Sequence, residues 1–424
     1  MKNPKELRND FWNEDIANGG AIYTQYVDIK HVLETKDFNL VQARVNAIKR
    51  HAIQHTDFYK DYKISDIFPV LDKSMILEKY EEHTARDGFE SPTHISSTSG
   101  STGIPFAVIQ DYYKRKRTIA DLKVFGELCD YPSHERMIFF RVINSKLHRT
   151  PEIEDKENIY YIDSSDLGEQ HLGEMVATII EKKPRIVFSY SSTLVELGKF
   201  ILSHKISNLN FTMHSVLTAG EGISDGNRKM LEKAFGCRVY RRYSDMELGI
   251  LGQDMGDGKS YLLNWGSYYF ECLKTDSDEP AANGEVGRIV ITDLFNKAFP
   301  LIRYDTGDLG ILEYKAGEFP YLREIYGRSR DCVYTVDGIL ISPANIFVTM
   351  WGTNNVKQWQ FIQEDQREYV MKLNCSGPVD ESDIIEKLKC VLGYEANIRI
   401  MYTAEIPVLA SNKRRAVICN YHKS

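Results

Sequence analysis

The sequence predicts an α/β protein with a large N-terminal domain, in which mostly parallel sheets are flanked by helices and joined by a β-rich subdomain, and a small α+β C-terminal domain. Its 424 residues exceed the usual size of one hydrophobic core, so two or more domains are expected. Short apolar runs alternate with amphipathic stretches in the middle of the chain, which indicates a parallel sheet covered by helices. The residues beyond Arg330 have an alternation of their own and are numerous enough for a small domain.

Helices are predicted for residues 1–90. Apolar residues at helical spacing mark one face of a helix there, namely Val41, Val45, Ile48 and Ala52. His51 and His55 fall in the same helix. We interpret both histidines as a partly exposed flank of this helix, in preference to catalytic residues.

Strands are predicted in the middle of the chain at 137–142, 185–190, 215–217 and 238–240, with helical stretches such as 172–182 between them. In parallel sheets of this kind, ligands bind beyond the carboxyl ends of the strands. Residues 218–222 and 243–247 directly follow predicted strands, so we expect them at this edge. From 284 to 322 the pattern changes to short β-rich pieces separated by glycines, which predicts the β-rich subdomain.

The predicted C-terminal domain contains strands near 369–373 and 396–401 and a helix near 384–392. The segment 327–331 precedes this pattern and is the expected boundary. The sequence therefore predicts an N-terminal domain of residues 1–326, a connecting segment of 327–331 and a C-terminal domain of 332–424.

Composition and charge exclude several classes of function. A net charge of −7 argues against a general binder of nucleic acids or membrane surfaces, since those partners need a basic face. The N-terminus lacks the apolar core of a secretory signal, and no apolar run approaches the roughly 18 residues that span a bilayer, so we expect a cytoplasmic protein. The seven cysteines are scattered without a Cys-x-x-Cys pair, which is typical of reduced thiols and not of a zinc site or a disulfide framework.

Residues 95–106, Ile-Ser-Ser-Thr-Ser-Gly-Ser-Thr-Gly-Ile-Pro-Phe, combine hydroxyls and glycines in one loop. Gly100 and Gly103 permit positive φ and a close approach of the main chain, so that inward-facing N–H groups can form a nest for an anion. The hydroxyl donors are Ser97, Thr98, Ser99, Ser101 and Thr102. No Gly-Lys-Ser/Thr follows, so this is not a Walker A loop. From composition alone, a phosphate-binding loop and a flexible Ser/Gly linker both stay open.

Further motifs follow this loop in a fixed order: Tyr243–Glu247, Tyr304–Asp308, Gly327–Asp331 and Ser411–Lys413. The series resembles the adenylate-forming enzymes, and within them the phenylacetate–coenzyme A ligase branch, especially the members linked to capsular polysaccharide synthesis. The matching segments span most of the chain: 96–105, 242–253, 284–308, 327–343 and 406–415.

The resemblance implies that the protein uses ATP and Mg²⁺ to activate a carboxylic acid as an acyl-adenylate, with coenzyme A as the expected acceptor of the acyl group. The loop from Ser97 to Gly103 would hold the β- and γ-phosphates, and Glu247 would coordinate Mg²⁺, which prefers hard oxygen ligands. The implied nucleotide-binding residues are Gly220, Glu221, Gly222, Tyr243, Ser244, Asp308 and Arg328. Among them, Tyr243 would lie against adenine and Asp308 would accept hydrogen bonds from the ribose hydroxyls.

The resemblance also implies a mobile C-terminal domain that carries the catalytic lysine. Lys413 would bridge the α-phosphate and the carboxylate as a flexible point charge; a solvated Lys-Arg-Arg run is the competing interpretation. The domain would rotate about Arg330, after which Gly338 would line the path of the thiol. The sequence around Gly338, Val-Asp-Gly-Ile, is at the same time a strong hairpin-turn signal.

Two residues depart from the family pattern, and a run of basic residues follows the hydroxyl-rich loop. Met246 stands where a Ser or Thr is usual before the glutamate, and Phe106 stands where a lysine often follows the loop proline. The run 114–117, Lys-Arg-Lys-Arg, is interpreted as a solvated helix face in preference to a phosphate-binding patch.

Several alternatives stay open at this point. The acceptor could be an amine or a carrier-protein thiol in polysaccharide or secondary-metabolite synthesis, because the acyl pocket is dispersed over segments such as 131–141 and 188–192. A different class of function is a non-catalytic nucleotide-binding homologue, which Met246 favours and the presence of Lys413 disfavours. The acid itself and the choice between a monomer and a homodimer are not predicted.

Overall fold

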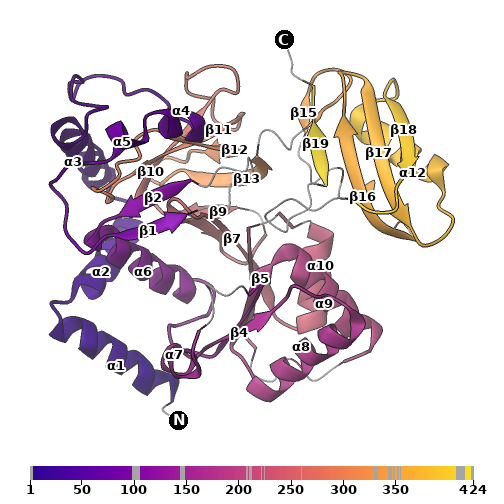
Figure 1. Cartoon of the computed structure of the whole chain (residues 1–424), viewed down its shortest axis with the longest axis horizontal. Helices are drawn as coiled ribbons and strands as arrows, with labels where there is room; N and C mark the ends of the chain where they lie inside the picture. The colour runs from indigo at the N-terminus through magenta and orange to yellow at the C-terminus, as the bar shows by residue number, and fades with distance from the viewer. Residues whose placement is uncertain are drawn as a thin grey trace.

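The computed structural model describes residues 3–97, 106–143, 149–206, 209, 213–220, 222–223, 225–258, 260–328, 333–341, 346, 349–350, 353, 355–406 and 416–421, without the side chains of Arg328 and Leu340. Figure 1 shows two parts: a large one built from the N-terminal three quarters of the chain, and a smaller C-terminal sheet that stands to one side of it. Among these described residues, no helix combines the length and the apolar character needed to cross a bilayer.

The N-terminal segment is helical, as predicted. It contains α1 (Pro4–Ala17), α2 (Ala21–Thr35), α3 (Phe38–His55), α4 (Lys73–Glu78) and α5 (Tyr80–His83). The predicted apolar face of α3 is buried, and Asp37 begins the helix by accepting a hydrogen bond from the N–H of Leu40. The interpretation of His51 as a partly exposed flank is wrong, because its side chain is buried with Nε2 2.9 Å from the carbonyl oxygen of Lys297.

One 11-stranded sheet forms the centre of the large part, in the order β10-β11-β12-β13-β9-β8-β7-β6-β5-β3-β4. Its parallel half consists of β3 (Met137–Arg141), β4 (Ile159–Asp163), β5 (Ile186–Tyr190), β6 (Ser215–Ala219) and β7 (Arg238–Asp245). The antiparallel half consists of β8 (Gly249–Asp254), β9 (Tyr261–Leu263), β10 (Tyr268–Leu273), β11 (Val286–Asp293), β12 (Tyr304–Glu313) and β13 (Tyr321–Arg328).

The sheet confirms the predicted parallel strands, but it differs from the prediction in the β-rich segment and in the length of β7. The β-rich segment 284–322 does not form short separate pieces, because its long strands continue the same sheet on the far side of β9. Strand β7 is also longer than predicted, so Tyr243 lies within the strand and not after it.

Helices cover both sides of the sheet. On one face, α8 (Glu169–Lys182), α9 (Ser191–Ser203) and α10 (Asp225–Phe235) bury Ile138, Phe140 and Val187 together with their own apolar residues. On the other side, α6 (Tyr112–Glu127) packs against α2 and β8. A separate hairpin of β1 (His94–Ser97) and β2 (Ala107–Gln110) precedes α6, and α7 (Pro151–Glu157) precedes β4.

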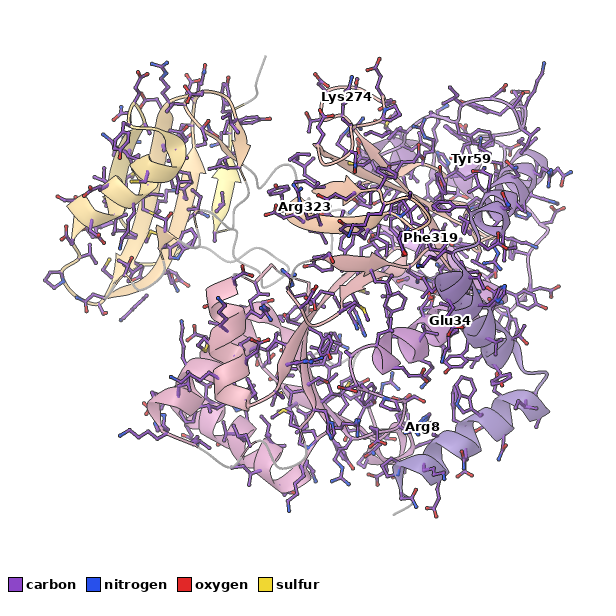
Figure 2. The ribbon with its side chains drawn as sticks, turned by 180° about the vertical axis from the view of Figure 1, so that it is seen from behind. Arg8, Glu34, Tyr59, Lys274, Phe319 and Arg323 are labelled. Carbon is purple, nitrogen blue, oxygen red and sulfur yellow. The ribbon has the colours of Figure 1, made fainter. Side chains whose placement is uncertain are left out.

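Aromatic side chains fill the layer between the antiparallel strands and the N-terminal helices. Figure 2 shows Phe319 in this layer. Its ring stacks on Trp265 at 5.3 Å and meets Phe38, the first residue of α3, edge-on at 4.7 Å. These contacts attach α3 to the sheet. Their partners are far apart in the sequence, so the helical pattern alone does not predict them.

The C-terminal part has its own core. Its elements are β14 (Val333–Tyr334), β15 (Leu340–Ile341), β16 (Val356–Gln363), β17 (Glu368–Cys375), α12 (Glu381–Leu392), β18 (Asn397–Tyr402) and β19 (Val417–Cys419). The sheet order is β18-β17-β16-β19, and the buried cluster beneath α12 draws only on residues 333–419. The two strands and the helix predicted here are confirmed.

His83 is a buried histidine whose pKa makes stability depend on pH. It packs on Phe58 at 3.9 Å, and its Nε2 has no hydrogen-bond partner among the described residues. Burial lowers the pKa of His83 to about 4 from 6.5. Because the unfolded chain then binds the proton more readily, this contribution to stability is complete above pH 6.5 and is lost as the pH falls toward 4.

We expect the free energy of unfolding of the wild type to lose about 3 kcal/mol over that window through His83. Urea unfolding of His83→Phe should therefore show a shallower decline from pH 6.5 to 4 than the wild type. The exposed His31→Gln should retain the wild-type decline. Parallel pH curves for wild type and His83→Phe would contradict the prediction.

Candidate functional site

A β-bulge shapes the Thr-Gly-Asp motif. Strand β12 pairs with β11 through Leu309↔Arg288 and Asp305↔Val290, so residues 306–308 all lie opposite Ile289. Gly307 adopts φ 75° and donates its N–H to Asp305 at 2.8 Å. Bulges of this kind redirect side chains, and Asp308 is left half-buried at the bulge. The motif is thus an irregularity within a strand and not a simple turn.

Tyr243 and Asp308 meet although they come from distant strands. The hydroxyl of Tyr243 on β7 donates to Oδ2 of Asp308 on β12 at 2.8 Å. Burial and the charge of Asp308 raise the pKa of Tyr243 well above its ordinary value, so the phenol stays protonated and able to donate. Three strands separate β7 from β12 in the sheet order, so the sheet must curl for this contact to form.

A tight turn after β7 holds Glu247. Oδ1 of Asp245 accepts the N–H of Leu248 at 2.6 Å, which closes the turn and leaves the Glu247 side chain buried. Burial and the nearby charge of Glu247 raise the pKa of Asp245 well above its ordinary value. Two carboxyl groups therefore lie close together in a poorly hydrated site, where a cation would stabilise both as carboxylates.

Met246, between them, points outward and is 59% exposed. Its carbonyl oxygen accepts a hydrogen bond of 2.6 Å from the hydroxyl of Ser96 on β1. This bond fixes the end of β1, and with it exposed Ser97, beside the turn that carries Glu247. The hydroxyl-rich loop that begins at 97 thus starts next to the acidic turn.

The donor set of this turn fits Mg²⁺ only in part. Among the described residues, no three His, Cys, Asp or Glu side chains gather in a geometry that could hold a metal ion. Mg²⁺ is usually bound by one or two carboxylates together with substrate phosphates and water, and not by an all-protein cage. Asp245 and Glu247 satisfy that smaller requirement.

Gly220 lies at the same edge of the sheet. It follows β6, whose last residue, Ala219, is the register partner of Arg242, the residue before Tyr243. Gly220 has φ 76°, and a Cβ built on it would come within 3.0 Å of the ring of Tyr190. Glycine is therefore required here both by backbone conformation and by space. Gly222 has open space around it.

Other predicted residues are placed differently. Ser244 is half-buried on β7 opposite Ile250, and Arg328 is the register partner of Asp308, so its backbone lies beside the bulge. Gly338 forms the turn between β14 and β15 with φ 75°, donating its N–H to the carbonyl oxygen of Thr335 at 2.9 Å, which confirms the hairpin signal. Outside the described residues are Thr98, Ser99, Gly100, Ser101, Thr102, Gly103, Glu221, Arg330 and Lys413.

The interpretation of residues 114–117 as a solvated helix face is wrong for two of the four. The side chains of Lys114 and Arg117 are completely buried. Nζ of Lys114 lies 2.7 Å from Oδ2 of Asp293, and Nη1 of Arg117 lies 2.6 Å from Oδ2 of Asp28. Buried charges need such partners because desolvation is costly.

Lys114 also connects this buried network to the acidic turn. Its Nζ donates to the hydroxyl of Tyr268 at 3.0 Å, and that hydroxyl donates to the carbonyl oxygen of Leu248. Leu248 is the residue whose N–H closes the turn at Asp245. Sequence reasoning missed this support, although Lys114, Arg117 and Asp121 recur at helical spacing and so mark one buried face of α6.

Phe106 has a packing role. Its side chain is completely buried, with its ring 6.3 Å from that of Phe299 and 6.2 Å from that of Tyr304. The departure from lysine at this position thus places a core residue at the exit of the hydroxyl-rich loop.

The chain is similar to several known proteins. Residues 333–420 match the family model described as the CapK C-terminal domain. Protein CapK of Staphylococcus aureus is 23% identical, with 93% of this chain and 92% of CapK covered. A phenylacetate-coenzyme A ligase of Thermus thermophilus is also 23% identical, over 49% of this chain and 46% of the ligase.

Solved structures share the fold. A 2-hydroxyisobutyryl-CoA ligase in the postadenylation state superposes with a TM-score of 0.70 at 16% identity, covering 90% of this chain and 89% of the ligase. ATP-bound MatB from Rhodopseudomonas palustris gives a TM-score of 0.55 at 14% identity, covering 76% of this chain and 66% of MatB.

Proposed function

We propose that this chain activates a carboxylic acid with ATP and transfers the acyl group to a thiol. The chain belongs to the adenylate-forming superfamily and to its branch of CapK and the phenylacetate–coenzyme A ligases. The observation that supports this most is the convergence of motifs at one edge of the sheet. Ser96 bonds to the turn of Glu247, and Tyr243 at the start of that segment bonds to Asp308. These residues are far apart in the sequence, and the fold brings them together where α/β proteins bind ligands.

The proposed chemistry is attack of the acid on the α-phosphate of ATP with departure of pyrophosphate. Negative charge grows on the phosphate oxygens in that step, so preorganised donors and cations are the main catalytic device. Mg²⁺, when bound, would neutralise charge on the phosphates beside Glu247. The loop from Ser97 to Gly103 would supply N–H and hydroxyl donors, and Lys413 would supply the mobile positive charge.

Nucleotide binding is proposed to rest on Tyr243 and Asp308 acting as a unit. The hydroxyl of Tyr243 holds one carboxylate oxygen of Asp308 in place, and the carboxylate would accept hydrogen bonds from the ribose. The ring of Tyr243 would face adenine, with Gly220, Glu221 and Gly222 on its other side. Ser244 and Arg328, one beside Tyr243 and the other opposite Asp308, complete the proposed set.

We further propose that residues 1–326 bind ATP and the acid, that 327–331 act as a hinge centred on Arg330, and that 332–424 form a mobile lid. The separate core of residues 333–419 supports independent movement of the lid. Coenzyme A is the proposed acceptor, with Gly338 at the turn that would line its path. An amine or a carrier-protein thiol as acceptor is the alternative.

Asp308→Ala should chiefly weaken ATP binding. Loss of a carboxylate that accepts from ribose, and of the partner of a buried tyrosine, is expected to raise the Kd for ATP at least about tenfold. Isothermal titration with ATP measures this directly. Tyr243→Phe, which keeps the ring and removes the hydroxyl that bonds to Asp308, should give a smaller loss in the same direction. An unchanged ATP affinity in Asp308→Ala would contradict the ribose assignment.

Gly338→Trp should impair the second half-reaction alone. The indole would fill the turn between β14 and β15, and φ 75° there is strained for any side chain. We expect normal pyrophosphate exchange and slow thioester formation from supplied acyl-adenylate. Gly338→Ala, equally strained but small, is the control for backbone effects. Thioester formation at the wild-type rate in Gly338→Trp would show that this turn does not line the thiol path.

A further inference from the structure

The face of the parallel sheet opposite α8–α10 carries a row of aromatic rings. Tyr161, Phe139 and Phe188 are register partners across β4, β3 and β5. The rings of Phe139 and Phe188 stack at 4.3 Å, and that of Tyr161 lies 5.6 Å from Phe139. All three side chains are half-buried, whereas Ile138 and Val187 on the opposite face are completely buried.

Two guanidinium groups lie over the stacked pair. Cζ of Arg141, two residues after Phe139 on β3, is 5.2 Å from the centroid of that ring. Cζ of Arg242, on β7, is 5.9 Å from the centroid of Phe188. Both arginines are half-buried; Arg141 is the last residue of β3, and Arg242 is the register partner of Ala219, the last residue of β6. This end of the parallel strands is the edge where ligands bind.

Neither guanidinium has a carboxylate partner within the part of the chain that the structure describes. Arg242 donates from Nε and Nη2 to the amide oxygen of Gln253, at 3.0 and 2.8 Å, which is a neutral acceptor. Asp163 is the register partner of Arg141, but its carboxylate instead accepts from the N–H of Ile143 and the hydroxyl of Ser165. Two cations thus share a partly desolvated surface, and no described carboxylate forms an ion pair with either of them.

Arg241, the residue before Arg242 on β7, does have a carboxylate partner. It points to the other face of β7, where its Nε donates to Asp254 at 2.5 Å. Although burial opposes it, the charges of Tyr261 and Asp254 raise the pKa of Arg241. Burial lowers the pKa of Arg242, to which the described residues supply no such carboxylate. The two adjacent arginines therefore differ: Arg241 forms an internal ion pair, whereas Arg242 is paired only with the neutral amide of Gln253 among the described residues.

We propose that Arg141 and Arg242 bind a second anionic group on the acid that is activated, so that the substrate is an aryl acid with a further carboxylate or a similarly charged substituent. This inference rests on the proposed function. The half-buried rings offer an apolar surface for the aromatic ring of a substrate, and a guanidinium fork matches a carboxylate in two parallel hydrogen bonds. Arg242 directly precedes Tyr243, and its partner Ala219 directly precedes Gly220, so this surface adjoins the proposed nucleotide site.

The test compares benzenedicarboxylates with their monomethyl esters, which keep the skeleton and remove one charge. ATP–pyrophosphate exchange gives the ratio of kcat/KM for the diacid over the ester, and the thermal shift on adding each acid without ATP reports binding alone. For the wild type we expect a ratio of at least about tenfold for one of the positional isomers. Arg242→Gln and Arg141→Gln should bring the ratio close to one and lose the thermal shift given by the diacid.

Arg241→Gln is the matched control, because it removes the same charge from the same strand on the opposite face. It should lower the melting temperature and keep the wild-type ratio. A thermal shift that depends on Arg242, without exchange for any acid, would retain this binding surface and contradict the proposed reaction. Equal ratios and shifts in wild type and both arginine variants, or no response to any diacid in either assay, would overturn the inference.

Discussion

Replacing Lys413 with Ala should slow acyl-adenylate formation about 10²- to 10³-fold, the size of effect seen when one preorganised donor is removed from a transition state. The physical reason is that the attack of a carboxylate on the α-phosphate brings two anions together, and a mobile ammonium can bridge them. The second half-reaction starts from acyl-adenylate and should proceed at close to the wild-type rate. Pyrophosphate exchange and thioester formation from supplied acyl-adenylate measure the two steps separately.

Arg414→Ala is the control for this prediction, since it removes a neighbouring positive charge from the same run. It should leave both half-reactions largely intact. Equal loss of both half-reactions in Lys413→Ala would contradict a role confined to adenylation. A large loss of adenylation in Arg414→Ala, with little effect in Lys413→Ala, would move the catalytic charge to the next residue.

Replacing Lys114 with Met is expected to destabilise the protein by about 3–5 kcal/mol, because it leaves a completely buried carboxylate without its cation. Lys114 and Asp293 are both inaccessible to solvent, and their charged atoms are 2.7 Å apart. The same change removes the hydrogen bond to Tyr268 and so loosens the turn of Glu247. Urea unfolding, followed by tyrosine and tryptophan fluorescence, measures the loss.

The double variant Lys114→Met with Asp293→Asn should recover much of that stability, since the amide carries no charge and keeps the oxygen that accepts the N–H groups of Phe295 and Asn296. Lys116→Met, on the same helix but over the ring of Tyr112 at the surface, should change the stability little. A loss in Lys114→Met no larger than that in Lys116→Met would show that the buried pair does not stabilise the fold.

Much of the fold follows from local patterns in the sequence. The helix at 38–55 and the strand and helix at 368–375 and 381–392 have strong periodicity, so their existence and type were predictable. The continuity of β10–β13 with the parallel strands was not predictable, because strand pairing depends on contacts between residues far apart in the chain. The sequence identifies strands there, but not the sheet to which they belong.

In the candidate site, too, the residues were predictable from the sequence, but the contacts between them were not. Motif order alone selects Tyr243, Glu247 and Asp308 as functional residues. It cannot show that the hydroxyl of Tyr243 bonds to Asp308, since that contact requires the bulge at 306–308 and a curled sheet. The basic run at 114–117 is a case in which the usual meaning of a charge run fails, because its acidic partners, Asp28 and Asp293, lie on distant segments.

Formation of an acyl-adenylate is the step on which the proposed function depends. The most direct measurement is the release of AMP and pyrophosphate from ATP and Mg²⁺ over a panel of aryl, fatty and amino acids, with and without coenzyme A. We expect the release to depend on a particular acid and, for full turnover, on coenzyme A. Exchange of pyrophosphate without turnover by coenzyme A would indicate a different acceptor. ATP binding without release of pyrophosphate across the whole panel would contradict acyl-adenylate formation and favour a non-catalytic nucleotide-binding protein.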